Sequence, residues 1–342
     1  MNRQKGSFLA DHFTPTVNAI ISVQRSDGSI PWFEGGVTDP WDQVESAMGL
    51  SAGGCLIEAK HAYEWLKKTQ LDDGSWYASY QDGHPGDTTK VSHFISYVAV
   101  GVWHHYLISE DVDFLKEMWP TVQDAIDFVI GMQAPGGEVY WARDSQGTIS
   151  LNALLTGSSS VYMSIKCAIA IASRLGEEKL HWEEANISLA EAIRDKPRVF
   201  DWPPRNRTFA MDWYYPVLCG VVTGNAARRR LLNRWETFVI QGLGSRCISE
   251  RPWVTAAETC ELAIALAAIG EHRRAATVFS WLSQMRDSDG AYWYGIVSPD
   301  GRIWPSQKPT WTSAAVLLAA DVLVPVSSTS QLFGRGINDA KS

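Results

Sequence analysis

The stretch WLKKTQLDDGSWY at residues 65–77 carries the pattern that decides the fold: a Gln, three residues, a Gly and then an aromatic side chain. Three other stretches repeat it: AIISVQRSDGSIPW at 19–32, FVIGMQAPGGEVYW at 128–141 and WLSQMRDSDGAYW at 281–293, where Arg286 replaces the Gln. Each copy follows an apolar run with helical spacing, and the Gly suits the left-handed residue that ends a helix. The pattern therefore marks the ends of repeated helices.

The spacing of the four copies predicts six helical hairpins, because the last interval is about three times as long as the others and leaves room for two degenerate copies. We expect outer, charge-bearing helices over 14–25, 57–69, 112–132, 181–195, 226–239 and 272–286. We expect inner helices, apolar on most faces and rich in Ala and Gly, over 42–53, 88–107, 157–175, 212–223, 254–269 and 310–323. Aromatic-rich stretches after the turns alternate like short β-hairpins.

Such helical pairs cannot bury their apolar faces alone, and no polar capping repeats are present, so the pairs must close on one another. The predicted fold is an all-α (α/α)6 toroid with short β-hairpin loops at its mouth. We expect a single domain over 1–342, ordered from about 8 to 326 and followed by a polar, partly loose tail.

Composition excludes several classes of partner. The net charge of −8 disfavours nucleic acid and anionic lipid, and no apolar run of a membrane span's length is evident. The N-terminal MNRQKGSFLADHF lacks the apolar core of a signal peptide. The five cysteines are scattered, without metal-ligand spacing, and are expected to be free thiols. We therefore expect a cytoplasmic protein without metal or cofactor, whose oligomeric state the sequence leaves open.

The first turns of the inner helices carry the functional signal. They read PWDQVESAM, DTTKVSHF, LLTGSSSVY, MDWYYP, PWVTAAETCEL and PTWTSAA, where a plain core would be small or apolar. Asp42 and Glu45 lie three residues apart on one helix face, as do Glu258 and Glu261. Asp42 alone has an equal alternative interpretation, an acidic residue that complements the helix dipole. The other three lie in apolar helices and must be paired or face a wet cavity.

Paired carboxylates that flank a sugar-sized gap are the apparatus of glycoside cleavage. We expect Asp42 and Glu258 to be the acid and base, in an order that the sequence leaves open, with Glu45 and Glu261 as alternates one turn deeper. Carboxylates on different hairpins of a wide ring fit the inverting geometry, which needs roughly 6.5–9.5 Å for a water molecule.

Sugar binding is the functional interpretation of the 16 tryptophans, because a flat apolar ring stacks on a pyranose face. For any single residue a structural role is an equal alternative. The expected substrate-binding residues are Trp32, Trp41, Trp76, Tyr80, His93, Trp141, Arg143, Asp144, Asp212, Trp213, Tyr214, Arg251, Trp253, Trp293 and Trp311.

Two families of toroid resemble parts of the chain. The segment WLKKTQLDDGSW at 65–76 resembles the QW repeat of terpenoid cyclases, but the D-x-D-D acid of triterpene cyclases and the D-x-C pair of protein prenyltransferases are absent. The segments DVDFLKEMWPTVQDAIDFV (111–129), WARDSQG (141–147) and LLTGSSSVYMSIKCAIAIASRLG (154–176) resemble six-hairpin glycosidases of the glucoamylase-like type, about a third of the chain. That second resemblance implies an inverting hydrolase of α-linked sugars, although its catalytic Glu residues cannot be matched motif by motif.

Within that superfamily, PWDQVESAM, MDWYYPVL and RPWVTAAETCEL are most similar to actinobacterial methylmannose polysaccharide hydrolases. This resemblance implies an endo-acting α-mannosidase on a partly methylated α-1,4-mannan, with an oligo- or polysaccharide as the partner. Two alternatives stay open: a terpenoid cyclase or prenyltransferase-like enzyme, and a toroid that binds glycans without cleaving them.

Overall fold

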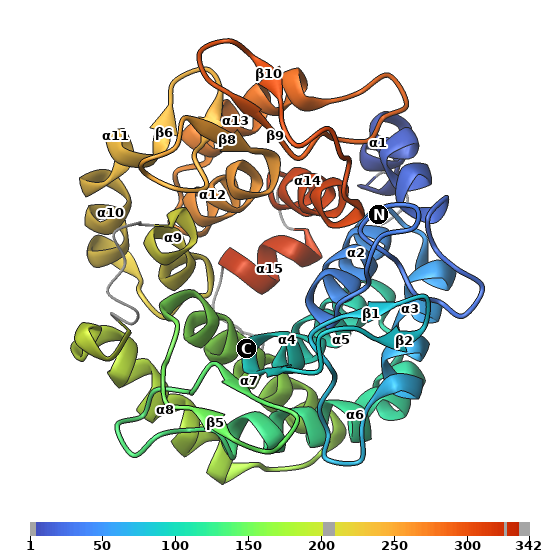
Figure 1. The fold of residues 1–342 in the computed structure, drawn as a ribbon, viewed down its shortest axis with the longest axis vertical. Helices are drawn as coiled ribbons and strands as arrows, with labels where there is room; N and C mark the ends of the chain where they lie inside the picture. Colours follow the sequence, from blue (N-terminus) through green and yellow to red (C-terminus); the bar gives the residue numbers. More distant parts are fainter. Residues whose placement is uncertain (1–4, 201–208, 325–326, 335–342) are drawn as a thin grey trace.

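The computed structural model describes residues 5–200, 209–324 and 327–334, and their helices form two concentric layers around one axis (Figure 1). The inner layer comprises α2 (Pro40–Ala52), α4 (Ser92–Ser96) with α5 (Val98–Ser109), α7 (Leu155–Leu175), α9 (Ala210–Leu218), α12 (Ala256–Ala268) and α14 (Thr310–Val322). The outer layer comprises α1 (Lys5–Ile21), α3 (Leu56–Thr69), α6 (Val112–Ile130), α8 (Leu180–Asp195), α10 (Gly224–Asn233) and α13 (His272–Ser280). Because α14 packs against α2, the last hairpin closes on the first. The predicted (α/α)6 toroid is confirmed.

Small residues let the inner helices approach closely where the ring closes. A Cβ added at Gly49 of α2 would lie 2.6 Å from the Cβ of Ala314 in α14. Any larger residue there would push the two helices apart, which costs packing energy. The high Ala and Gly content of the inner helices is thus a requirement of the closed ring.

The four copies of the repeated turn each fasten an outer helix to the next one around the ring. The side-chain amide of Gln70 donates to the carbonyl of Gly74 in its own turn (2.9 Å) and to that of Thr121 in α6 (2.9 Å). Gln24 and Gln133 make the same pair of hydrogen bonds, to α3 and α8. In the last copy Arg286 donates to the carbonyl of His12 in α1, across the closure.

The side chain two positions after the turn Gly points into the core in all four copies. These residues are Ile30, Trp76, Val139 and Tyr292, and none is more than 4% exposed. Two of the four are aromatic and two are aliphatic, so burial of an apolar side chain at this position contributes to the hydrophobic effect that stabilises the ring.

Helix ends differ from the expected ranges at several points. Helix α1 begins at Lys5, well before residue 14, and α9 ends at Leu218, where Gly220 takes a φ of +72° that ends a helix. The expected helix over 226–239 breaks after α10 and resumes as α11 (Trp235–Phe238). The last outer helix passes into the 3-10 helix η2 (Trp281–Met285), and a further one, η1, covers Pro197–Phe200.

Short strands cover the end of the ring where the inner helices begin, as expected for three of the four copies. They are β1 (Tyr80–Gln81), β2 (His84–Pro85), β3 (Lys90–Val91), β4 (Ala142–Arg143), β5 (Ile149–Ser150), β6 (Val239–Ile240), β7 (Gly244–Ser245), β8 (Trp253–Thr255), β9 (Gly295–Val297) and β10 (Arg302–Ile303). All pair antiparallel, in the orders β1-β2, β3-β4-β5, β6-β7 and β10-β9-β8. The stretch that follows the first copy forms a turn without a named strand.

Two inner-ring features were not foreseen. Residues of the expected loose tail form α15 (Ser328–Gly334), which lies inside the ring (Figure 1) with Thr329, Leu332 and Phe333 buried. Helix α7, at 21 residues, is also long and apolar enough to cross a bilayer, but 67% of that apolar window is buried within the protein. Its composition therefore fits its place in the inner layer. The five cysteines are free, as expected.

Candidate active site

The inner helices begin around one mouth, which holds a pocket of about 550 Å³. Its walls come from the starts of α2, α4, α7 and α9 and from the loops that precede them. The lining residues are Trp32, Val37, Asp39, Trp41, Asp42, Ala78, Ser79, His93, Phe94, Leu154, Thr156, Gly157, Phe209, Met211 and Asp212. Most of the lining is apolar, and its acidic groups are Asp39, Asp42 and Asp212.

Asp39 and Asp42 form a carboxyl pair at the start of α2. Asp39 is the N-cap: its side chain accepts hydrogen bonds from the Asp42 backbone N–H (2.9 Å) and from Trp32 Nε1 (2.6 Å). Burial raises the pKa of Asp42 well above its ordinary value, and the negative charges of Asp39, Glu45 and Glu261 add to the effect. Asp42 is therefore a carboxyl that retains its proton where an isolated Asp would lose it.

Glu258 lies in the first turn of α12, and its side chain is buried. The Thr255 hydroxyl donates to one carboxylate oxygen, and the Cys247 thiol also hydrogen-bonds to the group. Burial raises the pKa of the nearby Tyr294, and the charges of Glu258 and Asp42 raise it further. One phenol therefore lies within the electrostatic reach of both carboxyls, although Asp42 lines the mouth pocket and Glu258 does not.

Glu45 and Glu261 lie one turn deeper, as their spacing predicts. Tyr97 donates to Glu45 (2.7 Å), while Tyr215 (2.8 Å) and Tyr214 both donate to Glu261. Burial raises the pKa of Glu45 to about 7 and that of Glu261 to about 8. Both groups therefore hold protons for much of the time near neutral pH, which reduces the cost of burying them together.

Aromatic side chains shape the wall beside the carboxyls. Trp41 stacks on Tyr97 with ring centroids 4.4 Å apart and an interplanar angle of 12°. His93 meets the edge of Trp41 at 5.4 Å, and burial lowers the pKa of His93 to about 4. The imidazole is thus neutral and acts as part of an apolar wall.

Several predicted residues do lie at the mouth. Trp32, Trp41, Asp42, His93 and Asp212 line the pocket. Asp212 also accepts hydrogen bonds from the Thr156 backbone N–H and hydroxyl, which connects α9 to α7. Trp253 and Trp311 each contact Tyr294, with ring centroids 5.4 Å and 5.1 Å away.

Other predicted binding residues belong to the core. Trp76 and Trp213 are each 1% exposed, and their indole N–H groups donate to the carbonyls of Leu66 and Arg230. Tyr80 is also buried and packs its ring against Trp65. Tyr214 is buried and donates its hydroxyl hydrogen bond to Glu261. Trp76 and Tyr80 follow the Gly74 turn and Trp213 and Tyr214 lie on α9, and all four are buried, so the structure does not support the prediction that they stack on a ligand.

A further group shapes the loops around the ring. Arg143 donates to the carbonyl of Gly147 and Asp144 accepts from backbone N–H groups, so both stabilise the β4–β5 turn. Trp141 donates to the Ser150 hydroxyl across the same hairpin. Trp293 lies under the Lys308 ammonium, 5.0 Å from its centroid, and Arg251 is exposed before β8. None of the five lines the mouth pocket.

Five further residues lie at the site without having been expected there: Asp39, Phe94, Tyr97, Met211 and Tyr215. Asp39 had a local signal, since an acid directly before Pro40 is a typical N-cap. Met211 and Tyr215 stand in MDWYYP, a helix start already recognised as unusual. Tyr97 had no such signal, because its role depends on Glu45, which lies on another hairpin.

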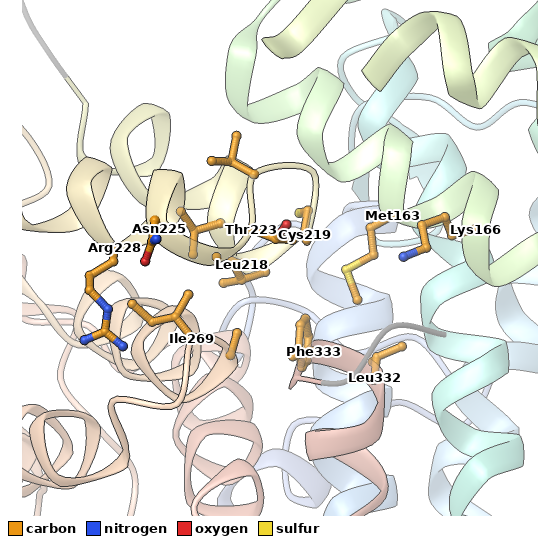
Figure 2. Close-up of a pocket in the computed structure, with 15 residues that line it drawn as sticks. Met163, Lys166, Leu218, Cys219, Thr223, Asn225, Arg228, Ile269, Leu332 and Phe333 are labelled. Carbon is orange, nitrogen blue, oxygen red and sulfur yellow. The ribbon is translucent and has the colours of Figure 1, made fainter. Parts of the chain in front are cut away.

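A second pocket of about 350 Å³ lies at the opposite end of the ring, where α9 and α12 finish (Figure 2). Figure 2 shows Leu332 and Phe333 of α15 beside Met163 of α7 and Cys219. Its charged lining residues, Lys166 and Arg228, are basic. Without a carboxyl in its lining, this pocket lacks the acid–base groups of the mouth.

Solved structures with the same fold include sugar-converting enzymes. The chain superposes on a wild-type glycosidase with a TM-score of 0.73 and 14% identity, over 94% of this chain and 99% of the other. It also superposes on a D-mannose isomerase with a TM-score of 0.71 and 12% identity, over 93% and 97%. At these identities the likeness shows the fold alone.

A curated relative is much closer in sequence. No protein-family model matches the chain. The MMP endo-(1,4)-3-O-methyl-alpha-D-mannosidase of Mycolicibacterium hassiacum is 49% identical over 333 residues, which cover 97% of this chain and 91% of the relative. Such identity over nearly the whole of both chains shows common family membership and excludes the isoprenoid interpretation of the QW-like segment. The protein is a glycoside hydrolase of the family of this endo-mannosidase.

Proposed function

We propose that the protein is an inverting, endo-acting hydrolase of α-1,4-linked mannan that carries O-methyl groups. The observation that carries the proposal is the carboxyl of Asp42, which lines the mouth pocket and whose pKa burial raises well above its ordinary value, with Glu258 buried in the first turn of another inner helix. Its substrate follows from the relative, whose name specifies an endo-(1,4)-3-O-methyl-α-D-mannosidase. The apolar lining supports it, since Phe94, Leu154 and Met211 suit methyl ethers better than free hydroxyls.

Asp42 is the general acid in this proposal and Glu258 the general base. Asp42 transfers its proton to the glycosidic oxygen as the bond from that oxygen to the anomeric carbon breaks. Water attacks the anomeric carbon from the opposite face, and Glu258 accepts the proton that this water loses. The product has the β configuration, and the proton on Glu258 returns to Asp42 through solvent.

The inverting outcome is supported by the helices that bear the two groups. Asp42 lies in the first turn of α2 and Glu258 in the first turn of α12, and α14 packs against both helices. Packed helices lie about 8–10 Å apart. Because a third helix lies between α2 and α12, their two carboxyls leave room for both the sugar and an attacking water molecule.

The test is incubation of the purified protein with α-1,4-mannan oligosaccharides, plain and 3-O-methylated, with the product anomers followed by NMR. We expect internal cleavage of the methylated chain and first appearance of the β-anomer. First appearance of the α-anomer would overturn the inverting mechanism alone. Binding without turnover of either glycan would favour a glycan-binding toroid and overturn the proposed function.

Asp39→Asn should shift the alkaline limb of the kcat/KM–pH profile to lower pH. The charge and hydrogen bond of Asp39 both raise the pKa of Asp42, so their removal lowers it and the acid loses its proton at a lower pH. Asn is a good N-cap and should preserve the start of α2. An unchanged alkaline limb, with an unchanged melting temperature, would show that Asp42 is not the acid.

A further inference from the structure

A line of aromatic rings leads from the exposed rim to the two carboxyls. It begins at Trp304, directly after β10, and passes to Trp253 of β8 with ring centroids 5.1 Å apart. Trp253 meets Tyr294 at 5.4 Å, and Tyr294 meets Trp311 at 5.1 Å. Trp311 meets Trp32 at 6.4 Å, and Trp32 donates to Asp39. These five rings, Trp304, Trp253, Tyr294, Trp311 and Trp32, form an aromatic track.

The outer end of the track is an exposed apolar surface. Trp304 is 51% exposed and its neighbour Ile303 is 36% exposed, although large apolar side chains normally avoid water. Exposed aromatic residues beside a functional cleft are typical of ligand contact. In Figure 1 β8 and β9 lie next to α12 and α14, and β10 lies farther out, at the edge of the ring.

The backbone holds Trp304 and Trp253 in place. The carbonyl of Trp304 accepts a hydrogen bond from Trp253 Nε1 (2.7 Å), and its N–H donates to the carbonyl of Gly295 in β9 (3.0 Å). Trp253 pairs with Val297 in the β8–β9 register. The only polar atom of the Trp253 indole is therefore satisfied within the protein, while part of the side chain stays exposed.

We propose that the aromatic track is a binding subsite for a sugar unit of the polysaccharide beyond those held at the carboxyls, with Trp304 as its outer stacking platform. The occupant is the α-1,4-mannan chain itself, because the track is continuous with the cleavage site: Trp32, its inner ring, donates to Asp39 and lines the mouth pocket together with Asp42. Methyl ethers increase the apolar area that each sugar offers to an indole face. This inference rests on the proposed function for the identity of the glycan.

The experiment compares Trp304→Ala with wild type on a long 3-O-methylated α-1,4-mannan and on the shortest oligosaccharide of that series that wild type cleaves. Loss of one aromatic contact should raise KM for the long chain about three- to tenfold, with kcat unchanged. KM for the short substrate should stay unchanged, because it does not reach the rim. Trp304→Phe, which keeps a stacking face, should restore most of the loss.

Ile57→Ala is the matched control, because Ile57 is also exposed (81%) but lies on outer helix α3. It should leave both KM values unchanged. An unchanged KM for the long chain in Trp304→Ala, or an equal rise for both substrates, would overturn the subsite. If wild type cleaves neither glycan, the proposed function fails on its own. The subsite is then tested by electrophoresis in gels that contain the methylated mannan, where wild type should be retarded more than Trp304→Ala. Equal mobility of the two proteins would overturn the subsite.

Discussion

Asp42→Asn and Glu258→Gln should each reduce kcat on the methylated mannan by about 10²–10⁴-fold, the usual contribution of a general acid or base. Both substitutions keep the shape of the side chain but remove its ability to exchange a proton. Asp42 is only partly exposed at the mouth, and Glu258 is buried beside Thr255. The folds should therefore persist, with melting temperatures and glycan affinities near those of wild type, measured by thermal unfolding and calorimetry.

The two roles are separable by the leaving group. An aryl mannoside whose phenol leaves without protonation needs no general acid, so Asp42→Asn should regain much of its lost activity on it. Glu258→Gln should not, because water still has to lose a proton. Asp113→Asn and Glu184→Gln, exposed acids of outer helices α6 and α8, are the matched controls. Near-normal turnover by both mouth variants would reject the assignment, and rescue of Glu258→Gln alone would reverse it.

Gly74→Ala should destabilise the protein far more than Gly54→Ala, although both glycines have a φ of +84°. Each substitution imposes the left-handed conformation on a residue with a Cβ, which costs about 1–2 kcal/mol. At Gly54 nothing lies within 4 Å of the added atom. At Gly74 the new Cβ would lie 2.3 Å from the backbone oxygen of Asp124 in α6. Separating the turn from that helix should add about 1–3 kcal/mol to the loss in the free energy of unfolding.

Urea and thermal unfolding of the two variants measure this difference directly. We expect both midpoints to fall further in Gly74→Ala, with the activity per folded molecule preserved. In the same turn, the Gln70 side-chain amide donates a hydrogen bond to the carbonyl of Thr121 in α6. Equal midpoints for the two variants would mean that the repeated turn does not fasten neighbouring outer helices.

Some residues that looked functional in the sequence proved structural, for a reason local to the turn. Trp76 and Tyr80 follow the Gly closely in an alternating aromatic stretch, and alternation alone does not show which face meets the core. The structure directs both inward. Trp253, the first residue of β8, and Trp304, directly after β10, instead stay at least partly accessible.

The tail differs from expectation over its described part. We expected a polar, partly loose tail from about residue 326, and Ser328–Gly334 form α15 inside the ring, while residues 335–342 lie outside the described part of the chain. The hydroxyl of Thr329 hydrogen-bonds to His104 (2.8 Å), and Ser328 donates to the carbonyl of Leu107. Polar side chains can be buried when partners are available, and these partners come from α5, more than 200 residues away in the sequence.

The sequence by itself determined the architecture, because the Gln-x-x-x-Gly turn and the helical apolar periods are local signals that recur along the chain. It also located the paired carboxylates, since spacing within one helix decides which residues share a face. Only the tertiary structure decided which acid keeps its proton and which aromatic rings remain accessible. Those properties depend on burial and on charges contributed by other hairpins: the pKa of Asp42 responds to Glu261, and Glu261 to Tyr214 and Tyr215. Closure of the ring brings these groups together from different hairpins, and a local sequence pattern cannot predict that proximity.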